Sequence, residues 1–368
     1  MNSEKLATPP SESQLTDSWP TLQKDSSSPL YGMRVLDLSE QLPGPYATLL
    51  LASLGATVIK IESPKGDAAR TIDPIMFENI NAGKTSLTLD LKIQSDRFRL
   101  YELLSDADVF IEGYRPGVTE RLGCDYVTLK ERKEKLIYCS ISGFGQTGPL
   151  SSRPTHDISL QAMAGALQPG VRVDRIGVPW VDLATGTSAA LAITAAWHQG
   201  SGAYLDMSML DSAVAWASVK PAAVRELEPT YGTVVTADQQ HMVIALLEDS
   251  MWQRLCIALS WDDWAQDRAF ATYLERRGLA QKIRTRLDVT LGQLSSERVQ
   301  ELAKLHDLPI GLVDESADPD TQTQLSSRFT QGGSPWRGCV PLPESLLQPL
   351  ASAPELNLPN QDSSIELK

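Results

Sequence analysis

Apolar runs of strand length alternate with helix-like stretches through the first half of the chain. The runs predicted as buried strands are Met33–Leu38, Thr57–Glu62, Ser86–Leu91, Val109–Glu112 and Leu136–Ser140. The helices predicted between them are Tyr46–Leu54, Ser95–Ser105 and Tyr126–Lys133. Strands that alternate with helices in this way predict an α/β fold with a doubly wound parallel sheet and right-handed crossovers.

The pattern changes in the second half of the chain. Tyr231–Leu247 has the pattern of a short hairpin that turns at Ala237–Gln240. Helical patterns follow at Ser250–Leu259, Ala269–Leu287 and Ser295–Leu305. A hairpin followed by helices predicts a second, smaller domain of the α+β class.

Length and composition indicate where these domains end. A chain of 368 residues favours two domains. The first 29 residues mix Ser, Pro, Lys and Glu with little periodicity, which is typical of disorder. We expect a disordered segment (1–29), a large domain (30–213), a linker (214–230), a small domain (231–307), a segment returning to the large domain (308–345) and a mobile tail (346–368).

Charge and cysteine content narrow the class of protein. The net charge of −13, with no basic stripe, argues against a nucleic-acid partner. The four cysteines have no Cys-x-x-Cys spacing, so we expect them to be reduced and mostly buried. The histidines are isolated, and no spacing typical of metal ligands occurs. No signal peptide or membrane-spanning run is visible, so we expect a cytoplasmic protein without a membrane partner.

One glycine-rich loop and the residues after it hold the candidate chemistry. Gly143, Gly145 and Gly148 allow the backbone to turn sharply and to approach a ligand closely. Asp182 follows among apolar and small residues, where a carboxylate is costly to bury unless something holds it. The alternative interpretation of Asp182 is an N-cap of the helix predicted at Ala184–Trp197.

A series of short motifs runs from Met33 to about Ala213 in an order typical of one family. The motifs are Val35–Leu38, Pro43–Pro45, Leu54–Glu62, Asn81–Lys84, Leu89–Lys92, Ala107–Glu112, Arg115–Gly117, Arg121–Gly123, Leu136–Cys139, Ser142–Pro149 and Asp206–Asp211. Together they resemble the class III CoA-transferase (CaiB/BaiF) family, which includes formyl-CoA transferase, carnitine CoA-transferase and α-methylacyl-CoA racemase. The resemblance implies a Rossmann-like large domain, a smaller second domain and an interlocked homodimer.

The resemblance also implies a reaction. Asp182 matches the aspartate that the family's transferases use as a nucleophile on an acyl-CoA thioester. Covalent catalysis of this kind divides one difficult acyl transfer into easier steps. Acyl-CoA and a carboxylic acid would be the substrates, with no tightly bound cofactor. Backbone donors of the Gly143–Gly148 loop are candidates to stabilise the developing oxyanion.

A rival reaction on the same scaffold is racemisation. His156 matches the racemase histidine and Glu248 matches its glutamate partner, so that the pair and Asp182 would act as opposed acids and bases. The sequence has no glycine-rich lid of the kind found in some transferases, which favours this alternative. His156 can also be an ordinary core histidine and Glu248 a solvated carboxylate at a helix start.

Asp157 is expected to hold a loop or to orient His156. A non-catalytic relative that binds CoA esters is the third alternative.

Several side chains are candidates to bind CoA, whose phosphates suit basic groups and helix N-termini. Arg121 is the best of them, since it lies in the matched motif, and Tyr114 can lie against the adenine. The other candidates are Arg115, Lys84, Lys60, Gly143 and Gly145. Each basic side chain can instead be an ordinary surface cation.

Overall fold

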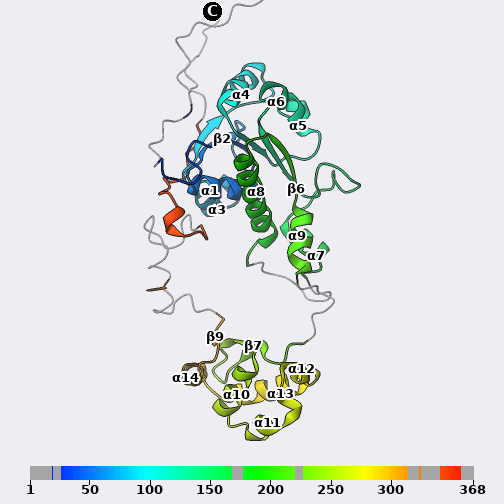
Figure 1. Cartoon of the computed structure of the whole chain (residues 1–368), viewed down its shortest axis with the longest axis vertical. Coiled ribbons are helices and arrows are strands. Elements are labelled where there is room, and N and C mark those ends of the chain that lie inside the picture. Colours follow the sequence, from blue (N-terminus) through cyan, green and yellow to red (C-terminus); the bar gives the residue numbers. More distant parts are fainter. Residues whose placement is uncertain are drawn as a thin grey trace, which may run out of the picture. The chain divides into compact units, whose positions relative to one another are not determined.

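The computed structural model describes Trp19 and residues 26–167, 177–219, 227–313, 323–324 and 340–357. The chain divides into two compact units, of which the first comprises Met1–Ala222 and Gln331–Lys368 and the second comprises Ala223–Thr330 (Figure 1). Every predicted segment except the small domain falls partly outside the described residues. The residues outside are 1–18 and 20–25 of the disordered segment, 168–176 of the large domain, 220–226 of the linker, 314–322 and 325–339 of the return segment, and 358–368 of the mobile tail.

A six-stranded parallel sheet forms the centre of the first unit, as predicted. Its order is β3-β2-β1-β4-β5-β6, and every pair of neighbours is parallel. The strands are β1 (Arg34–Leu38), β2 (Thr57–Glu62), β3 (Thr85–Thr88), β4 (Val109–Glu112), β5 (Ile137–Ser142) and β6 (Ala203–Ser208). Only β6 has no counterpart among the predicted strands, because its residues alternate between half-buried and exposed and form no continuous apolar run.

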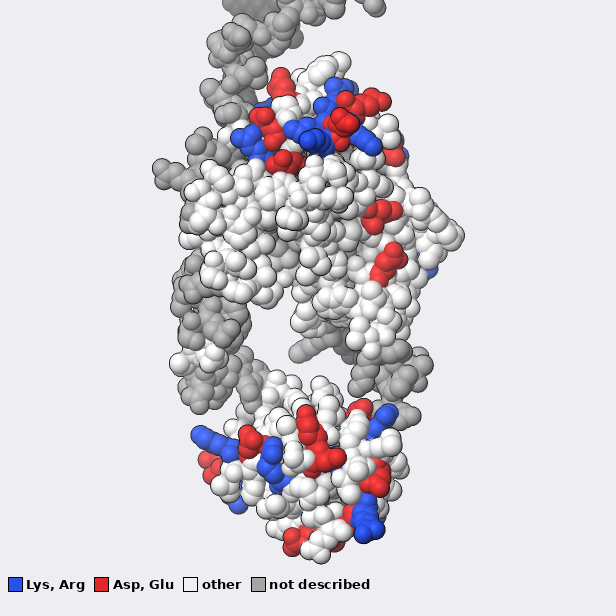
Figure 2. Space-filling view, in the orientation of Figure 1, with Lys and Arg blue, Asp and Glu red and all other residues white. Residues whose placement is uncertain are grey.

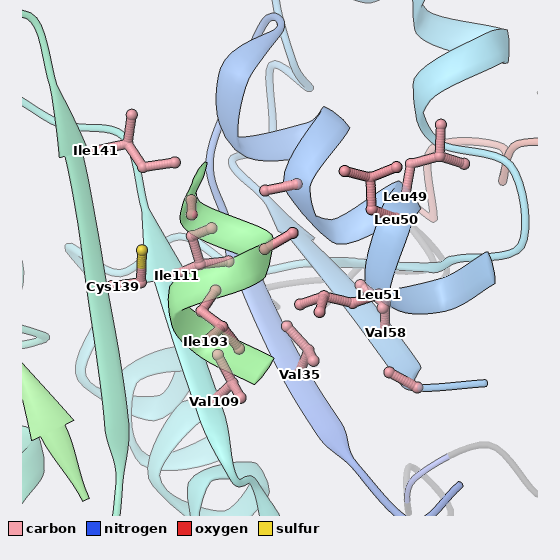
Figure 3. Packing of buried hydrophobic residues seen from close by; sticks show 14 of the residues in the cluster. Val35, Leu49, Leu50, Leu51, Val58, Val109, Ile111, Cys139, Ile141 and Ile193 are labelled. Carbon is pink, nitrogen blue, oxygen red and sulfur yellow. The ribbon is translucent and has the colours of Figure 1, made fainter. Parts of the chain in front are cut away.

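Helices cover both faces of this sheet, so each face has its own apolar core. α1 (Pro43–Ser53) and α8 (Trp180–Gln199) pack on one face against Val35, Val58 and Val109, as Figure 3 shows. α4 (Gln94–Asp106) and α6 (Tyr126–Arg132) pack on the other face. The remaining helices of the unit are α2 (Ala69–Ile72), α3 (Pro74–Ile80), α5 (Val118–Leu122), α7 (Asp157–Met163) and α9 (Met209–Ser218).

Two parts of the chain that were predicted to be disordered or mobile pack on the first unit. They are Trp19 and the described part of the predicted tail, residues 346–357. Trp19, within the predicted disordered segment, is buried in the core beneath α4 and donates a hydrogen bond from Nε1 to Leu103 O at 3.2 Å. The described part of the predicted mobile tail is docked by backbone contacts. Gln348 N donates to Ser53 O at 2.8 Å, and Gly83 N donates to Ala351 O at 2.8 Å.

The second unit joins a three-stranded antiparallel sheet to a group of helices. Its strands are β7 (Tyr231–Val235), β8 (His241–Ala245) and β9 (Ile310–Leu312), in that order. Its helices are α10 (Asp249–Ala258), α11 (Asp262–Gln266), the 3-10 turn η3 (Arg268–Phe270), α12 (Tyr273–Gly278), α13 (Ala280–Leu291) and α14 (Ser296–His306). Another 3-10 turn, η4 (Glu344–Leu346), is part of the first unit. The single helix predicted at Ala269–Leu287 is therefore wrong, because a Thr272–Glu275 capping box starts a new helix there. No helix among the described residues is long and apolar enough to cross a membrane.

Candidate active site

The topology of the sheet determines where a ligand fits. From β1 the chain crosses to β2 on one side, whereas from β4 it crosses to β5 on the other side. A crevice forms outside the carboxyl ends of two such neighbouring strands. The segments that leave these two strands are Ser39–Gly44 and Gly113–Arg115. Both line one cavity, with a volume of about 340 Å³.

The remaining walls of this cavity come from the chain after β5 and from α8. Ser142 is the last residue of β5 and Gly143 follows it. Ser151 and Arg153–His156 also line the cavity, in the segment that leads into α7. Asp182 lies in the first turn of α8. The structure thus brings five predicted site residues to one cavity: Asp182, His156, Tyr114, Arg115 and Gly143.

Asp182 is not the N-cap of α8. Pro179 occupies the N-cap position, and the capping carboxylate comes from Asp157, whose Oδ1 accepts hydrogen bonds from Val181 N at 2.8 Å and Asp182 N at 3.2 Å. Gln161 Nε2 donates to the other carboxylate oxygen of Asp157. Asp157 therefore holds the first turn of α8 and, through it, the backbone of Asp182.

The environment of Asp182 disfavours its charged form. Burial, followed by the negative charge of Asp157, raises the pKa of Asp182 to about 7. No cation pairs with this carboxyl group among the residues that the structure describes. A carboxyl group with a raised pKa in a cavity suits catalysis as a nucleophile or as an acid and base near neutral pH.

A glycine sets how closely α8 approaches α1. A Cβ atom on Gly186 would lie 2.6 Å from Pro43 O, closer than real side chains allow. Because α1 begins at the wall of the cavity, this close contact brings Asp182, one turn before Gly186, to the same cavity.

Charged side chains of both signs line the cavity beside Asp182. Arg115, Arg153 and His156 are exposed within it, and the structure describes no ion pair for the two arginines. Glu40, in the segment after β1, is half-buried in the wall of the same cavity, where burial, followed by the charge of Asp67, raises its pKa. The cavity therefore offers cationic groups to an anionic ligand.

Glu112 anchors the segment after β4. Its carboxylate accepts a hydrogen bond from Tyr114 N at 2.7 Å, and burial raises the pKa of Glu112 to about 7. Asp37, one residue before the end of β1, acts in the same way, since its Oδ1 accepts a hydrogen bond from Ser39 N at 3.0 Å. Each of the two segments at the crevice is thus bound by an acidic side chain of its own strand.

Lys60 and Lys84, which were predicted to bind CoA, form ion pairs in the interior of the fold. The side chains of Lys60 and Lys84 are fully buried, with their ammonium groups next to Asp67 at 2.8 Å and Asp37 at 3.2 Å. Burial, only partly offset by Asp37, lowers the pKa of Lys84 to about 8. Neither ammonium group is available to a CoA phosphate in this arrangement, because each is enclosed by protein atoms.

The glycine-rich loop divides between two roles. Gly143 lines the cavity, and a Cβ atom there would lie 2.3 Å from Cγ2 of Thr155. Gly145 has a positive φ of 79° and does not line the cavity. The amide that follows it, Gln146 N, donates to the Asp206 carboxylate at 3.0 Å, so this part of the loop is tied to the end of β6.

A second cavity of about 290 Å³ shares Leu38 and Tyr114 with the first. Its other walls include Lys65, Lys92 and Leu122. Arg121 is exposed on α5, next to Leu122, and does not itself line either cavity. The two cavities together can hold an extended ligand with a basic rim at one end.

The remaining candidate, Glu248, belongs to the second unit. It occupies the N-cap position of α10, where its carbonyl oxygen accepts from Met251 N and Trp252 N at 3.1 Å, and its side chain makes no capping hydrogen bond. Its role in catalysis stays a prediction.

Glu40, Arg153 and the second cavity were missed by the sequence analysis. A signal for Glu40 was available, since it follows the first strand at the point where a doubly wound sheet binds ligands. No comparable signal marks Arg153, because the chain between β5 and α7 has no regular pattern. No cluster of potential metal ligands occurs among the described residues.

The fold and the site define a protein with a ligand crevice of the Rossmann kind and a reactive carboxyl group inside it. The profile of CoA-transferase family III matches residues 30–335, and the chain belongs to this family. The chain is 32% identical to a succinyl-CoA:mesaconate CoA-transferase of Haloarcula hispanica over 88% of this chain and 93% of the relative. It is 32% identical to an acetyl-CoA:oxalate CoA-transferase of Acetobacter aceti over 85% of this chain and 87% of that relative. A crystal structure of a CaiB/BaiF family protein from Brucella suis has a TM-score of 0.74, with 29% identity over 90% of this chain and 97% of that one.

Proposed function

We propose that this protein transfers CoA from an acyl-CoA thioester to a carboxylic acid through a covalent intermediate on Asp182. The observation that carries the proposal is the Asp182 carboxyl group, with a pKa raised to about 7, in the cavity at the switch point of the sheet. Membership of the transferase family supports the same reaction.

The steps follow from the chemistry of a carboxylate and a thioester. The ionised Asp182 attacks the thioester carbonyl carbon, so that a mixed anhydride forms and CoA thiolate leaves. The thiolate then attacks the aspartyl carbonyl of the anhydride, which gives an aspartyl-CoA thioester and releases the donor acid. The acceptor carboxylate attacks the aspartyl carbonyl of this thioester, so that CoA thiolate leaves and a second mixed anhydride forms. The thiolate then attacks the acceptor's acyl carbon in this anhydride, which gives the new acyl-CoA and releases the Asp182 carboxylate.

The acceptor acid is proposed to be a small dicarboxylate. Arg115 and Arg153 lie in the same cavity as Asp182 and can hold a second carboxylate while the first one reacts. The relatives from Haloarcula hispanica and Acetobacter aceti are named for succinyl-CoA with mesaconate and for acetyl-CoA with oxalate. Mesaconate and oxalate, the free acids in these names, both carry two carboxylates. The second cavity, with Lys65 and Lys92, would receive the nucleotide part of CoA, with Arg121 at its rim.

Racemisation remains the second candidate function, because His156 and Asp182 share one cavity. An acid and a base on opposite sides of a thioester can remove and return the α-proton. The transferase reaction is preferred, since the relatives are named as transferases. A relative that only binds CoA esters is the third candidate.

A homodimer is part of the proposal. α8 exposes Leu191 with 71% of its surface accessible, and α9 exposes Trp216 with 53%, although both are large apolar side chains. Figure 2 shows that few charged side chains cover this region of the first unit. An exposed apolar area on two neighbouring helices is typical of a surface that another copy of the chain covers.

Two assays on the same samples separate the candidates. Succinyl-CoA and acetyl-CoA are incubated with oxalate, mesaconate or glutarate, and new CoA esters are measured by mass spectrometry. In parallel, deuterium uptake at C2 of a 2-methylacyl-CoA is followed in heavy water. We expect new CoA esters, and a loss of at least about a thousandfold in Asp182→Asn. Exchange at C2 that both Asp182→Asn and His156→Ala abolish, without transfer, would establish racemisation instead. CoA-ester binding without either reaction would leave the binding-only candidate.

A further inference from the structure

Four buried charged side chains lie beneath the segment that joins β1 to α1, residues Ser39–Pro45, here called the β1 loop. None of the four side chains is exposed to solvent. Two are acidic and two are basic, so their formal charges cancel. We call them the anchor cluster: Asp37 on β1, Lys60 on β2, Asp67 after β2 and Lys84 before β3.

The basic members hold carbonyl oxygens of the β1 loop. Lys60 Nζ donates to Ser39 O at 2.9 Å, at the start of the loop. Lys84 Nζ donates to Pro45 O at 2.9 Å, at its end. A buried ammonium group makes a strong hydrogen bond to a carbonyl, because little water competes for either partner.

The acidic members hold amide groups of the same loop. Asp37 accepts from Ser39 N, and Asp67 Oδ1 accepts from Gln41 N at 3.0 Å. Gln41 is not a glycine, yet its φ is 63°, in the left-handed region that L-residues rarely adopt. A residue held in such a conformation at a ligand cavity is typical of a functional constraint, since the surrounding structure must stabilise it.

Stability alone does not explain this arrangement. A buried ion pair is frequently no more stabilising than apolar side chains of similar size, because the charges lose their hydration. What the anchor cluster adds is four directional contacts to the backbone of one loop. Residues Ser39–Gly44 of this loop line the same cavity as Asp182.

We infer that the anchor cluster positions the β1 loop for the CoA thioester, so that Asp37, Lys60, Asp67 and Lys84 are positioning residues of the reaction. They contact neither cavity themselves and act through the backbone of Ser39–Pro45. The inference rests on the proposed function, because it concerns the wall of the same cavity.

The test separates stability from positioning. Lys60→Met leaves the Asp67 carboxylate buried without its cation, so we expect a lower Tm and a fall in kcat/KM of about a hundredfold. The double variant Lys60→Met/Asp67→Leu removes both charges together. We expect its Tm to recover, while kcat/KM stays low, because Ser39 O and Gln41 N still lack their partners. Recovery of both quantities together would overturn the inference.

Two further variants keep the test decisive. Leu104→Ala shortens a buried side chain at the end of α4, on the opposite face of the sheet, and serves as the control that lowers Tm without lowering kcat/KM. Gln41→Pro removes the amide that Asp67 accepts from and excludes a positive φ, at a side chain that is exposed. We expect it to reduce kcat/KM at least about tenfold more than Gln41→Gly does, since glycine retains both features. Equal values for these two variants would contradict the inference.

Backbone hydrogen exchange provides a readout that does not depend on the reaction. In the double variant we expect the amides of Ser39–Leu42 and Gly44 to exchange faster than in the wild type, while those of β4 and β5 do not. If the wild type transfers no CoA, the proposed function fails, and exchange still decides whether the cluster holds the loop. Unchanged exchange at Ser39–Leu42 and Gly44 would overturn the inference even with an active enzyme.

Discussion

At the scale of single residues, Asp182 is the group on which the account depends. The sequence predicted its importance from its match to the aspartate of the transferase family and from its apolar neighbours. It could not predict that Asp157, and not Asp182, caps α8, because both are acidic residues near the start of the same helix. The burial of Lys60 and Lys84 could not be predicted either, since lysine usually lies at the surface. No pattern in the sequence shows that folding brings Lys60 to Asp67 and Lys84 to Asp37.

The raised pKa of Asp182 predicts a pH-dependent effect on stability. The folded protein keeps this proton up to about pH 7, whereas the unfolded chain loses it near 3.8, so stability falls as pH rises between these values, by roughly 4 kcal/mol in total. Asp182→Asn removes a charge that is costly to bury. We therefore expect it to raise Tm at pH 8, with a gain that shrinks as pH falls towards 5, in thermal unfolding followed by circular dichroism. An equal change in Tm at both pH values would show that this carboxyl group titrates normally.

At the level of helices and strands, apolar periodicity predicted most strands of the parallel sheet well. It predicted neither every helix boundary nor the order of the strands in the sheet. The run Thr57–Glu62 was predicted with its observed bounds, and so was Val109–Glu112. The break within Ala269–Leu287 was missed, because apolar spacing continues across the Thr272 cap. The cavity depends on which strands are neighbours, and the sequence of a parallel sheet leaves that order open, since each connection passes through a helix.

The cap of α8 predicts a change in the pH–rate profile. In the wild type, kcat/KM for CoA transfer should rise with pH through an apparent pKa of about 7, as Asp182 ionises. Asp157→Asn retains an oxygen that can accept from Val181 N but removes the negative charge. Because that charge raises the pKa of Asp182, we expect the rising limb to move to lower pH.

The matched variant Asp157→Ala removes the cap as well as the charge. We expect it to shift the same limb and, in addition, to lower stability by about 1 kcal/mol, which denaturant unfolding measures. A rising limb at the same pH in both variants and the wild type would contradict the electrostatic coupling between Asp157 and Asp182.

At the scale of the whole molecule, the two units and their fold classes follow from the change in pattern along the chain, from strand–helix alternation to a hairpin and helices. The docked residues 346–357 do not, because a polar, proline-containing end resembles a mobile tail in sequence even where its backbone is bonded to Gly83 and Ser53. Assembly likewise has no signal in periodicity; it is proposed from the resemblance and from the exposed Leu191 and Trp216.

The proposed homodimer predicts a definite mass in solution. Light scattering coupled to size-exclusion chromatography should give twice the chain's 40.2 kDa. Since Leu191 and Trp216 are apolar, the mass should not fall at high salt, whereas an association between charged surfaces would weaken. A mass of one chain at micromolar concentration would contradict the dimer.

Oxygen labelling shows whether the Asp182 carboxylate forms covalent bonds during CoA transfer. The acceptor acid is supplied with oxygen-18 in its carboxylates, together with an acyl-CoA donor, and the peptide that contains Asp182 is analysed by mass spectrometry after turnover. The bridging oxygen of the second anhydride comes from the acceptor and stays on Asp182 when thiolate takes the acyl group. We therefore expect oxygen-18 in this peptide only when donor and acceptor are both present. Transfer of CoA with no label on Asp182 would contradict the account.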